Sequence, residues 1–301
     1  MINPLLLAIC KRRVPPGTLQ TTILFKGCPL HCVECHTPAL QHEELEVSTS
    51  KSRCIGCREC VHGCPESALS LDRQQTVRRD SSLCTACLNC VEICPTQVHA
   101  TVGYRCSIDQ IMAEIGTGSR QADHNEHEVI FAGGEPLLQA KALLVLLARC
   151  GERDLQRLVV TTGFAPTQVL LAVARHTEQL HITLQHMDSR KHQRYTGATN
   201  ALLLHNLRQL AENGGSFCIR LPLLPGFNTD DDNILATARF AATLPGLQGL
   251  DLVPGNPAAQ LEGSCGAICQ GEQEQCSLTE ADLDHIVKIL KASGCTVRIG
   301  P

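Results

Sequence analysis

The sequence predicts an α/β fold in which six β-α units form an incomplete barrel, a partial (β/α)6 arrangement interrupted by a small cysteine-rich insert. Three observations lead to this prediction. Short apolar runs alternate with longer segments of helical periodicity, as in parallel sheets whose strands are joined by helices. Glycines stand where those helices should end. Finally, 11 of the 19 cysteines form three ordered runs in the first third of the chain.

The expected strands are apolar stretches of five to seven residues, and one of them precedes the insert. Residues 21–26 form this first strand, and five more follow the insert at residues 128–132, 155–161, 181–185, 216–221 and 247–253. Helical patterns at residues 137–150 and 201–213 lie between strands and end near glycines. The expected domains are residues 1–49 for the start of the barrel, 50–100 for the insert and 101–301 for the rest of the barrel.

Composition limits the setting in which this fold would work. The 301 residues, 43% of them hydrophobic, can bury a full core. No apolar run reaches membrane-spanning length, and the positive charges of the first residues follow the apolar stretch instead of preceding it, so we expect a cytoplasmic protein with reduced thiols. A net charge of −4 and zero Trp argue against a nucleic-acid partner.

The two later cysteine runs match the spacing of bacterial two-cluster ferredoxins. Each reads C-x2-C-x2-C-x3-C-P, and the two align without a gap as an internal repeat. In that fold the fourth cysteine of each run binds the other cluster. Zinc sites favour two separated C-x-x-C pairs, and disulfides need no triplets, so both explain the pattern less well. One 4Fe-4S cluster is therefore expected on Cys54, Cys57, Cys60 and Cys94, and another on Cys84, Cys87, Cys90 and Cys64.

The first run has only three cysteines, Cys28, Cys32 and Cys35, directly after the first expected strand. Three cubane clusters would take twelve thiolates, and the three runs supply eleven. A cluster held by three thiolates leaves one iron open, and an amino acid can chelate that iron through its amine and carboxylate. Because barrel chemistry gathers at the carboxyl ends of strands, this loop is the expected catalytic site.

Three segments together resemble the radical S-adenosylmethionine (radical SAM) superfamily, and within it the glycyl-radical enzyme activating proteins. They are the C-x3-C-x2-C loop, the stretch Phe-Ala-Gly-Gly-Glu-Pro after the second strand, and the Arg-Leu-Pro-Leu-Leu-Pro-Gly-Phe-Asn stretch that starts at Arg220. The position of the two-cluster insert, between the first loop and the second strand, is also similar to larger members of the family. The resemblance implies a radical SAM barrel with an inserted ferredoxin-like domain.

The activity that the resemblance implies is that of an oxidoreductase. It would use three 4Fe-4S clusters and S-adenosylmethionine, cleave the cofactor reductively to a 5′-deoxyadenosyl radical, and install a glycyl radical on a partner enzyme. The insert would relay electrons from a flavodoxin or ferredoxin. No membrane partner is expected.

Some of the expected cofactor-binding residues lie in these three segments, and others lie outside them. Gly133, Gly134, Glu135 and Pro136 would lie along the methionine part of the cofactor, with Glu135 accepting a hydrogen bond from its amine. The alternative explanation of the glycines and the proline is an ordinary turn that ends the strand. The alternative explanation of Arg220 is a solvated surface charge. By resemblance, a lysine and a histidine usually bind the cofactor carboxylate. Their positions are taken here by Gln185 and Asn256, which leaves Arg220 as the expected cation.

Two other functions remain open at this stage. The chain could be an electron-transfer iron-sulfur protein with a degenerate barrel, although such a relay would not need the first cysteine loop. It could also be a divergent radical SAM enzyme that acts on a small molecule or a peptide. Release of 5′-deoxyadenosine separates the relay from an enzyme, and dependence on a protein partner separates the small-molecule reaction from activation.

Overall fold

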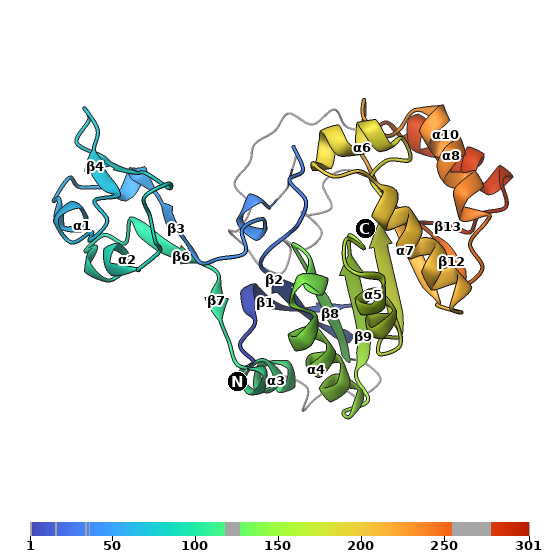
Figure 1. Ribbon diagram of the computed structural model, residues 1–301, viewed down its shortest axis with the longest axis horizontal. Coiled ribbons are helices and arrows are strands. Elements are labelled where there is room, and N and C mark those ends of the chain that lie inside the picture. The colour runs from blue at the N-terminus through green and yellow to red at the C-terminus, as the bar shows by residue number, and fades with distance from the viewer. Residues whose placement is uncertain are drawn as a thin grey trace.

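The computed structural model describes residues 2–15, 17–33, 35, 37–117, 127–254 and 278–300. Figure 1 shows two parts: a large sheet with helices packed along it, and a small insert that stands to one side. The chain enters the insert through β3 and leaves it through β6, which leads to β7 at the edge of the large sheet.

The large sheet has nine strands in the order β13-β12-β11-β10-β9-β8-β2-β1-β7. From β2 to β13 every neighbouring pair is parallel, while β1 pairs antiparallel with β2, and β7 pairs antiparallel with β1. All six predicted strands are present, as β2 and β8 to β12. The strands are β1 (Leu5–Val14), β2 (Thr18–Phe25), β7 (Tyr104–Arg105), β8 (His127–Gly133), β9 (Gln156–Thr161), β10 (Gln179–Thr183), β11 (Phe217–Leu223), β12 (Leu247–Pro254) and β13 (Val297–Ile299).

Helices in the connections between the parallel strands bury one apolar face against the sheet. Leu143, Leu146 and Leu147 of α4 and Leu207 of α7 are completely buried in the main core. These side chains recur at helical spacing, which explains why the segments fold as amphipathic helices. Both helix patterns predicted from the sequence are present, α4 after a short 3-10 turn. The helices are α3 (Ile108–Gly116), η5 (Pro136–Gln139), α4 (Ala140–Gly151), α5 (Thr167–Ala174), α6 (Ser189–Thr196), α7 (Ala201–Glu212), α8 (Asp231–Ala241) and α10 (Glu280–Ala292).

The opposite face of the sheet carries a smaller apolar cluster, which includes Leu24 of β2 and Ile130 and Ala132 of β8. Val160 of β9 packs against it. Because side chains alternate between the two faces of a strand, Val159 instead joins the main core under the helices. The inner face therefore continues towards the carboxyl ends of the strands, where the cysteine loop begins.

The insert is built as two similar halves. β3 (Glu46–Thr49) pairs antiparallel with β6 (His99–Val102), which brings the start and the end of the insert together. β4 (Leu69–Leu71) pairs antiparallel with β5 (Val77–Arg79) in the middle of the insert. Short helices α1 (Glu59–His62) and α2 (Asn89–Ile93) each begin after a residue in the left-handed conformation. These residues, Arg58 and Leu88, occupy equivalent positions of the repeat, as do Ser67 and Gln97, which also have positive φ. The backbone thus follows the duplication seen in the sequence.

In the ranges that the structure describes, every helix is too short or too polar to cross a bilayer.

Candidate active site

The cysteine loop begins where β2 ends and is fixed on two sides by main-chain hydrogen bonds. On one side, the amide of Cys28 donates to the carbonyl of Gln41 at 3.0 Å. On the other, the amides of His31 and Val33 donate to the last carbonyls of α6, those of Thr196 and Tyr195, both at 2.8 Å. Bonds to carbonyls at a helix end use acceptors that the helix itself leaves free. Two distant parts of the chain therefore hold the loop in shape.

The three cysteines of the loop line a cavity of about 200 Å³ at the carboxyl ends of β8 to β12. Of the residues expected to bind the cofactor, Gly133, Gly134, Gln185 and Arg220 line the same cavity. Pro136 is buried in η5 instead, and Asn256 lies outside the described residues. Thr37, Leu40, Val160, Thr162, Thr183 and Tyr195 also line the cavity, although nothing in the sequence assigned them to it.

Burial controls the protonation of the loop thiols. It raises the pKa of Cys28 to about 12 and that of Cys32 to about 12, because a thiolate loses hydration there. The pKa of Cys35 is also raised by burial, against hydrogen bonds from the main chain of Thr37 and from Gln41. Without a cation the three groups are neutral thiols at pH 7. A metal that binds here must release protons, which makes binding favourable at higher pH.

Glu135 is completely buried, and its carboxylate accepts four hydrogen bonds from the protein. One carboxylate oxygen accepts from the amide of Leu137 at 2.9 Å and from the hydroxyl of Thr161 at 2.6 Å. The other accepts from the amide of Thr162 at 2.8 Å and also from its hydroxyl. Burial raises the pKa of this carboxyl, and the four hydrogen bonds act against that shift. Since a carboxylate has about four acceptor positions, Glu135 joins β8 to β9 and holds Thr162 at the cavity wall.

Gly133 and Gly134 are explained by the close approach of the main chain at the end of β2 and of η1. A Cβ on Gly133, whose φ is +125°, would lie 2.3 Å from the carbonyl oxygen of Phe25. A Cβ on Gly134 would lie 2.2 Å from the carbonyl oxygen of Gly27 and 2.6 Å from that of Leu40. The two glycines let the cysteine loop pack directly on the end of β8. Approach of a ligand to a bare main chain, the reason inferred from the sequence, is not needed to explain them.

The far wall of the cavity is polar and carries one buried acceptor. Within the described ranges, Oε1 of Gln185 is buried and has no hydrogen-bond partner. Arg220 is placed beside Thr183 of β10 and Asp251 of β12 by the register of the parallel strands. Burial lowers the pKa of Arg220, and the Asp251 carboxylate acts in the opposite direction. The wall thus offers an amide oxygen and a guanidinium to a ligand.

One layer deeper, His181, Cys218 and Asp251 present possible metal-binding atoms within 4.8 Å of one another. A cationic side chain already binds two of these three residues. Arg298 donates from Nε to Asp251 and from Nη2 to the sulfur of Cys218, both at 2.7 Å. We therefore assign this group to a partly exposed ion pair that connects β11, β12 and β13.

Tyr195 is fixed at the cavity by an aromatic contact. Its ring stacks on Phe227 with centroids 4.1 Å apart and planes inclined by 22°. Phe227 in turn meets the ring of His186 edge-on at 5.2 Å. A rigid aromatic ring at the rim of a cavity can contact a planar ligand group. The three segments that carry the family resemblance do not include Tyr195, so this role could not be assigned from them.

The cysteines of the insert gather in the crossed sets expected from the repeat. Around Cys60 lie Cys94, Cys57 and Cys54, and around Cys90 lie Cys84, Cys87 and Cys64. Main-chain amides point at several of the sulfurs: Val77 donates to Cys54, Ala68 to Cys64 and Val98 to Cys94, at 3.3 to 3.4 Å. Such N–H groups stabilise negative charge on thiolates and clusters.

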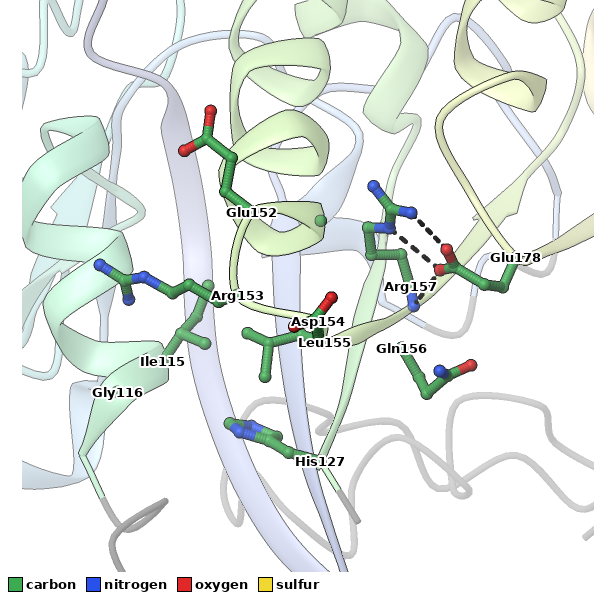
Figure 2. A pocket seen from close by; sticks show the side chains of 11 residues that line it. Ile115, Gly116, His127, Glu152, Arg153, Asp154, Leu155, Gln156, Arg157 and Glu178 are labelled. Carbon is green, nitrogen blue, oxygen red and sulfur yellow. Dashed lines mark hydrogen bonds and ion pairs between the residues drawn. The ribbon is translucent and has the colours of Figure 1, made fainter. Parts of the chain in front are cut away.

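Within the described ranges, a larger cavity lies elsewhere. It measures about 650 Å³ and is lined by the amino ends of β8 and β9, at the opposite end of the sheet from the cysteine loop. Figure 2 shows its charged lining, in which the Arg157 side chain is paired with Glu178. His127 is buried there and bonds through Nε2 to the Thr21 hydroxyl at 2.9 Å. Size therefore does not identify the site, since none of the residues that line this cavity is a cysteine.

Comparisons with known proteins agree with this geometry. Residues 94–240 match the Radical SAM superfamily and residues 53–98 the 4Fe-4S dicluster domain. The chain is 30% identical to the trans-4-hydroxy-L-proline dehydratase activating enzyme of Clostridioides difficile, over 99% of this chain and 100% of that one. It is 33% identical to the benzylsuccinate synthase activating enzyme of Thauera aromatica, over 95% and 88%. A radical SAM methyltransferase from Sphaerobacter thermophilus shares the fold, with a TM-score of 0.51 at 15% identity over 96% of this chain and 72% of that one.

The fold and the cysteine loop thus define a radical SAM enzyme that carries a 4Fe-4S dicluster domain. More narrowly, the chain belongs to the family of glycyl-radical enzyme activating enzymes, as the sequence predicted.

Proposed function

We propose that this protein cleaves S-adenosylmethionine reductively and installs a glycyl radical on a partner enzyme. The observation that carries the proposal is the shared cavity: three half-buried thiols of one loop face Gln185 and Arg220 across about 200 Å³. A pure electron relay would need neither this loop nor a cavity beside it. When bound, the open-iron cluster and S-adenosylmethionine supply a one-electron cleavage that gives methionine and a 5′-deoxyadenosyl radical.

The residues of the cavity fit these two groups. Cys28, Cys32 and Cys35 would hold the cluster as thiolates after losing their protons to solvent. The unpartnered Oε1 of Gln185 suits the amine of the methionine part, because a buried acceptor without a donor is costly. Arg220 suits the carboxylate, which it can bind through two N–H groups. Glu135, with its four acceptor positions in use, would position Thr162 and not touch the ligand.

The insert would carry two further clusters, which makes three in the chain. The crossed sets around Cys60 and Cys90 support this count. We infer that electrons arrive from a flavodoxin or ferredoxin. An acidic donor of this kind would be attracted by exposed basic side chains of the insert, which are Lys51, Arg53, Arg58, Arg73 and Arg78.

The partner is inferred from the relatives. The two activating enzymes compared above are named for two different enzymes, a dehydratase and a synthase. A third relative, the choline trimethylamine-lyase activating enzyme of Oleidesulfovibrio alaskensis, is 31% identical over 79% of this chain and 78% of that one. We therefore propose a glycyl-radical enzyme as the protein substrate and the enzyme encoded beside this gene as the first candidate.

Anaerobic reconstitution tests the proposal. The protein should take up about twelve irons and release 5′-deoxyadenosine when given a strong reductant and S-adenosylmethionine. The matched control replaces Cys28, Cys32 and Cys35 together by Ala, which should leave about eight irons and only background release. Addition of the partner should give a carbon-centred radical doublet on that protein. Equal release by the wild type and the triple variant would favour a relay, and release that no glycyl-radical enzyme accelerates or consumes would favour a small-molecule substrate.

A further inference from the structure

Lys26, the residue that follows β2, carries its ammonium group into the interior of the molecule. Its side chain is 0% exposed, although lysine is among the residues least often fully buried. Nζ donates to the carbonyl oxygen of Ala39 at 2.8 Å and to Oε2 of Glu46 at 2.7 Å. A methionine would fill similar space without the desolvation cost of a charge. The ammonium group therefore needs an explanation beyond packing.

The main chain of Lys26 is fixed to the large sheet. Its amide donates to the carbonyl of Leu5 at 3.0 Å, and its carbonyl accepts from Nε2 of Gln139 at 2.9 Å. The same Gln139 side chain exchanges two hydrogen bonds of 2.8 Å with the main chain of Leu5. The side chain of Lys26 thus extends from a firmly held point of the barrel.

The partners of this side chain lie in three connections that meet around it. Ala39 belongs to the short 3-10 helix η1 (Pro38–Leu40) that follows the cysteine loop. Glu46 is the first residue of β3, where the chain enters the insert. The stem of Lys26 packs on Gly103, between β6 and β7, where the chain leaves the insert; a Cβ at Gly103 would lie 2.7 Å from Cδ of Lys26. A larger side chain at Gly103 would push the lysine out of place.

We propose that the Lys26–Glu46 pair is the joint that fixes the ferredoxin-like insert relative to the cysteine loop. This inference rests on the proposed function, in which the insert passes one electron to the cluster of the loop. That step oxidises the insert cluster, reduces the loop cluster and makes or breaks no bond, so its rate depends on the separation and orientation of the two groups. Lys26 and Glu46 are positioning residues for this step.

Hydrogen exchange tests the joint itself. In Lys26→Met, main-chain amides of residues 39–48 and 100–106 should exchange roughly tenfold faster, while those of β9 to β12 keep their protection. Lys26→Arg keeps a buried cation and should stay close to the wild type. The control is Lys141→Met, which removes an exposed lysine of α4. Unchanged exchange at both segments in Lys26→Met would overturn the joint.

The rate of electron transfer to the loop cluster tests whether the joint positions the insert for that step. After rapid reduction by a protein donor, freeze-quench EPR should show the loop cluster of Lys26→Met reduced roughly tenfold more slowly than in the wild type. Reduction by a small chemical reductant, which reaches the loop directly, should keep its rate, as should both reactions in Lys141→Met. Equal slowing by both reductants, with full iron content, would show that Lys26 acts on the loop cluster alone and would overturn the proposal.

A double-mutant cycle assigns the effect to the pair. Glu46→Gln should slow donor-driven transfer less than Lys26→Met, because an amide oxygen can still accept from the ammonium group. The double variant should be no slower than Lys26→Met alone, and additive slowing would refute the pairing. Exchange and transfer between clusters do not require S-adenosylmethionine. If the wild type transfers electrons but never cleaves the cofactor, the proposed function fails while the joint stands.

Discussion

The insert takes all its cysteines from one stretch, residues 46–102, whereas the cavity beside the cysteine loop is walled by strands drawn from most of the chain. The insert core is small. Its buried apolar cluster consists of Val47, Leu69, Val77 and Val98 together with Cys60 and Cys90. The barrel buries dozens of apolar side chains. A domain as small as the insert usually needs metal or disulfides, and a domain as large as the barrel does not. The two parts should therefore depend on iron to different degrees.

Removal of iron should give the largest difference between the two parts. We expect the insert to unfold when a chelator strips the protein under reducing conditions, because cluster binding there is also folding energy. The barrel should keep its helices and its protected amides. Hydrogen exchange followed peptide by peptide would measure both. A stripped protein whose insert stays protected would break the comparison.

Glu135→Ala should be the most damaging single change in the barrel outside the core. It removes a buried carboxylate and leaves the donors of Leu137, Thr161 and Thr162 without an acceptor, which should cost about 3 to 5 kcal/mol of unfolding free energy. Denaturant titration of the reconstituted protein would measure the loss. Glu128→Ala, near the start of the strand that precedes Glu135 and half-buried, is the control. A loss as small as that of the control would contradict the bracing role of Glu135.

Arg220→Ala should weaken cofactor binding without unfolding the barrel. Loss of a charge-assisted contact to a carboxylate should cost about 1.5 to 3 kcal/mol, or roughly ten- to a hundredfold in affinity. Gln185→Ala should cost less, because its amide oxygen makes one neutral hydrogen bond. Gln185→Lys, which replaces the acceptor for the amine by a second cation, should also weaken binding. Isothermal titration would decide, and unchanged affinity in both Arg220→Ala and Gln185→Lys would show another arrangement.

Acidification should produce a smaller effect through His181 of the barrel. Burial lowers the pKa of His181 to about 4, against the nearby Asp251 carboxylate. Because this pKa is depressed in the folded state, the neutral ring contributes stability above its usual value near 6.5, and that contribution is lost as the pH falls towards 4. Stability should drop by on the order of 1 kcal/mol across this window. His181→Gln should flatten the profile in thermal unfolding, and an equally steep profile in the variant would exclude His181 as the cause.

The same contrast explains how much could be predicted from the sequence. The insert could be recognised as a 4Fe-4S dicluster domain, because its cysteine runs and their repeat are local in sequence. The six central strands were also recognisable as apolar runs. β1 was missed because its second half carries Lys11, Arg12 and Arg13, and β13 because it has only three residues. Both lie towards the edges of the sheet, where pairing and not hydrophobicity decides the structure.

The cavity was only partly predictable for a related reason. Gly133 and Gly134 were singled out correctly as part of the region, but their cause lies in β2 and η1, which touch them from elsewhere in the chain. Likewise, the partners of Glu135 come from the next strand, and Tyr195 reaches the rim from α6. Such contacts depend on register and helix placement, which local patterns do not specify. Asn256, the remaining expected residue, stays a prediction.

The order of the strands has a consequence for how the protein behaves at high concentration. In the part of the chain that the structure describes, the nine-stranded sheet is open, and its outermost strands, β7 with two residues and β13 with three, are the shortest in it. An open sheet is prone to add strands from other copies when its borders are long and regular. β13 offers only a brief row of main-chain donors and acceptors, but β7 covers just Leu5 and Leu6 of the ten-residue β1. Along the uncovered part of β1, Lys11, Arg12 and Arg13 place positive charge on the border, which is one of the ways in which natural edge strands discourage fibrous self-association.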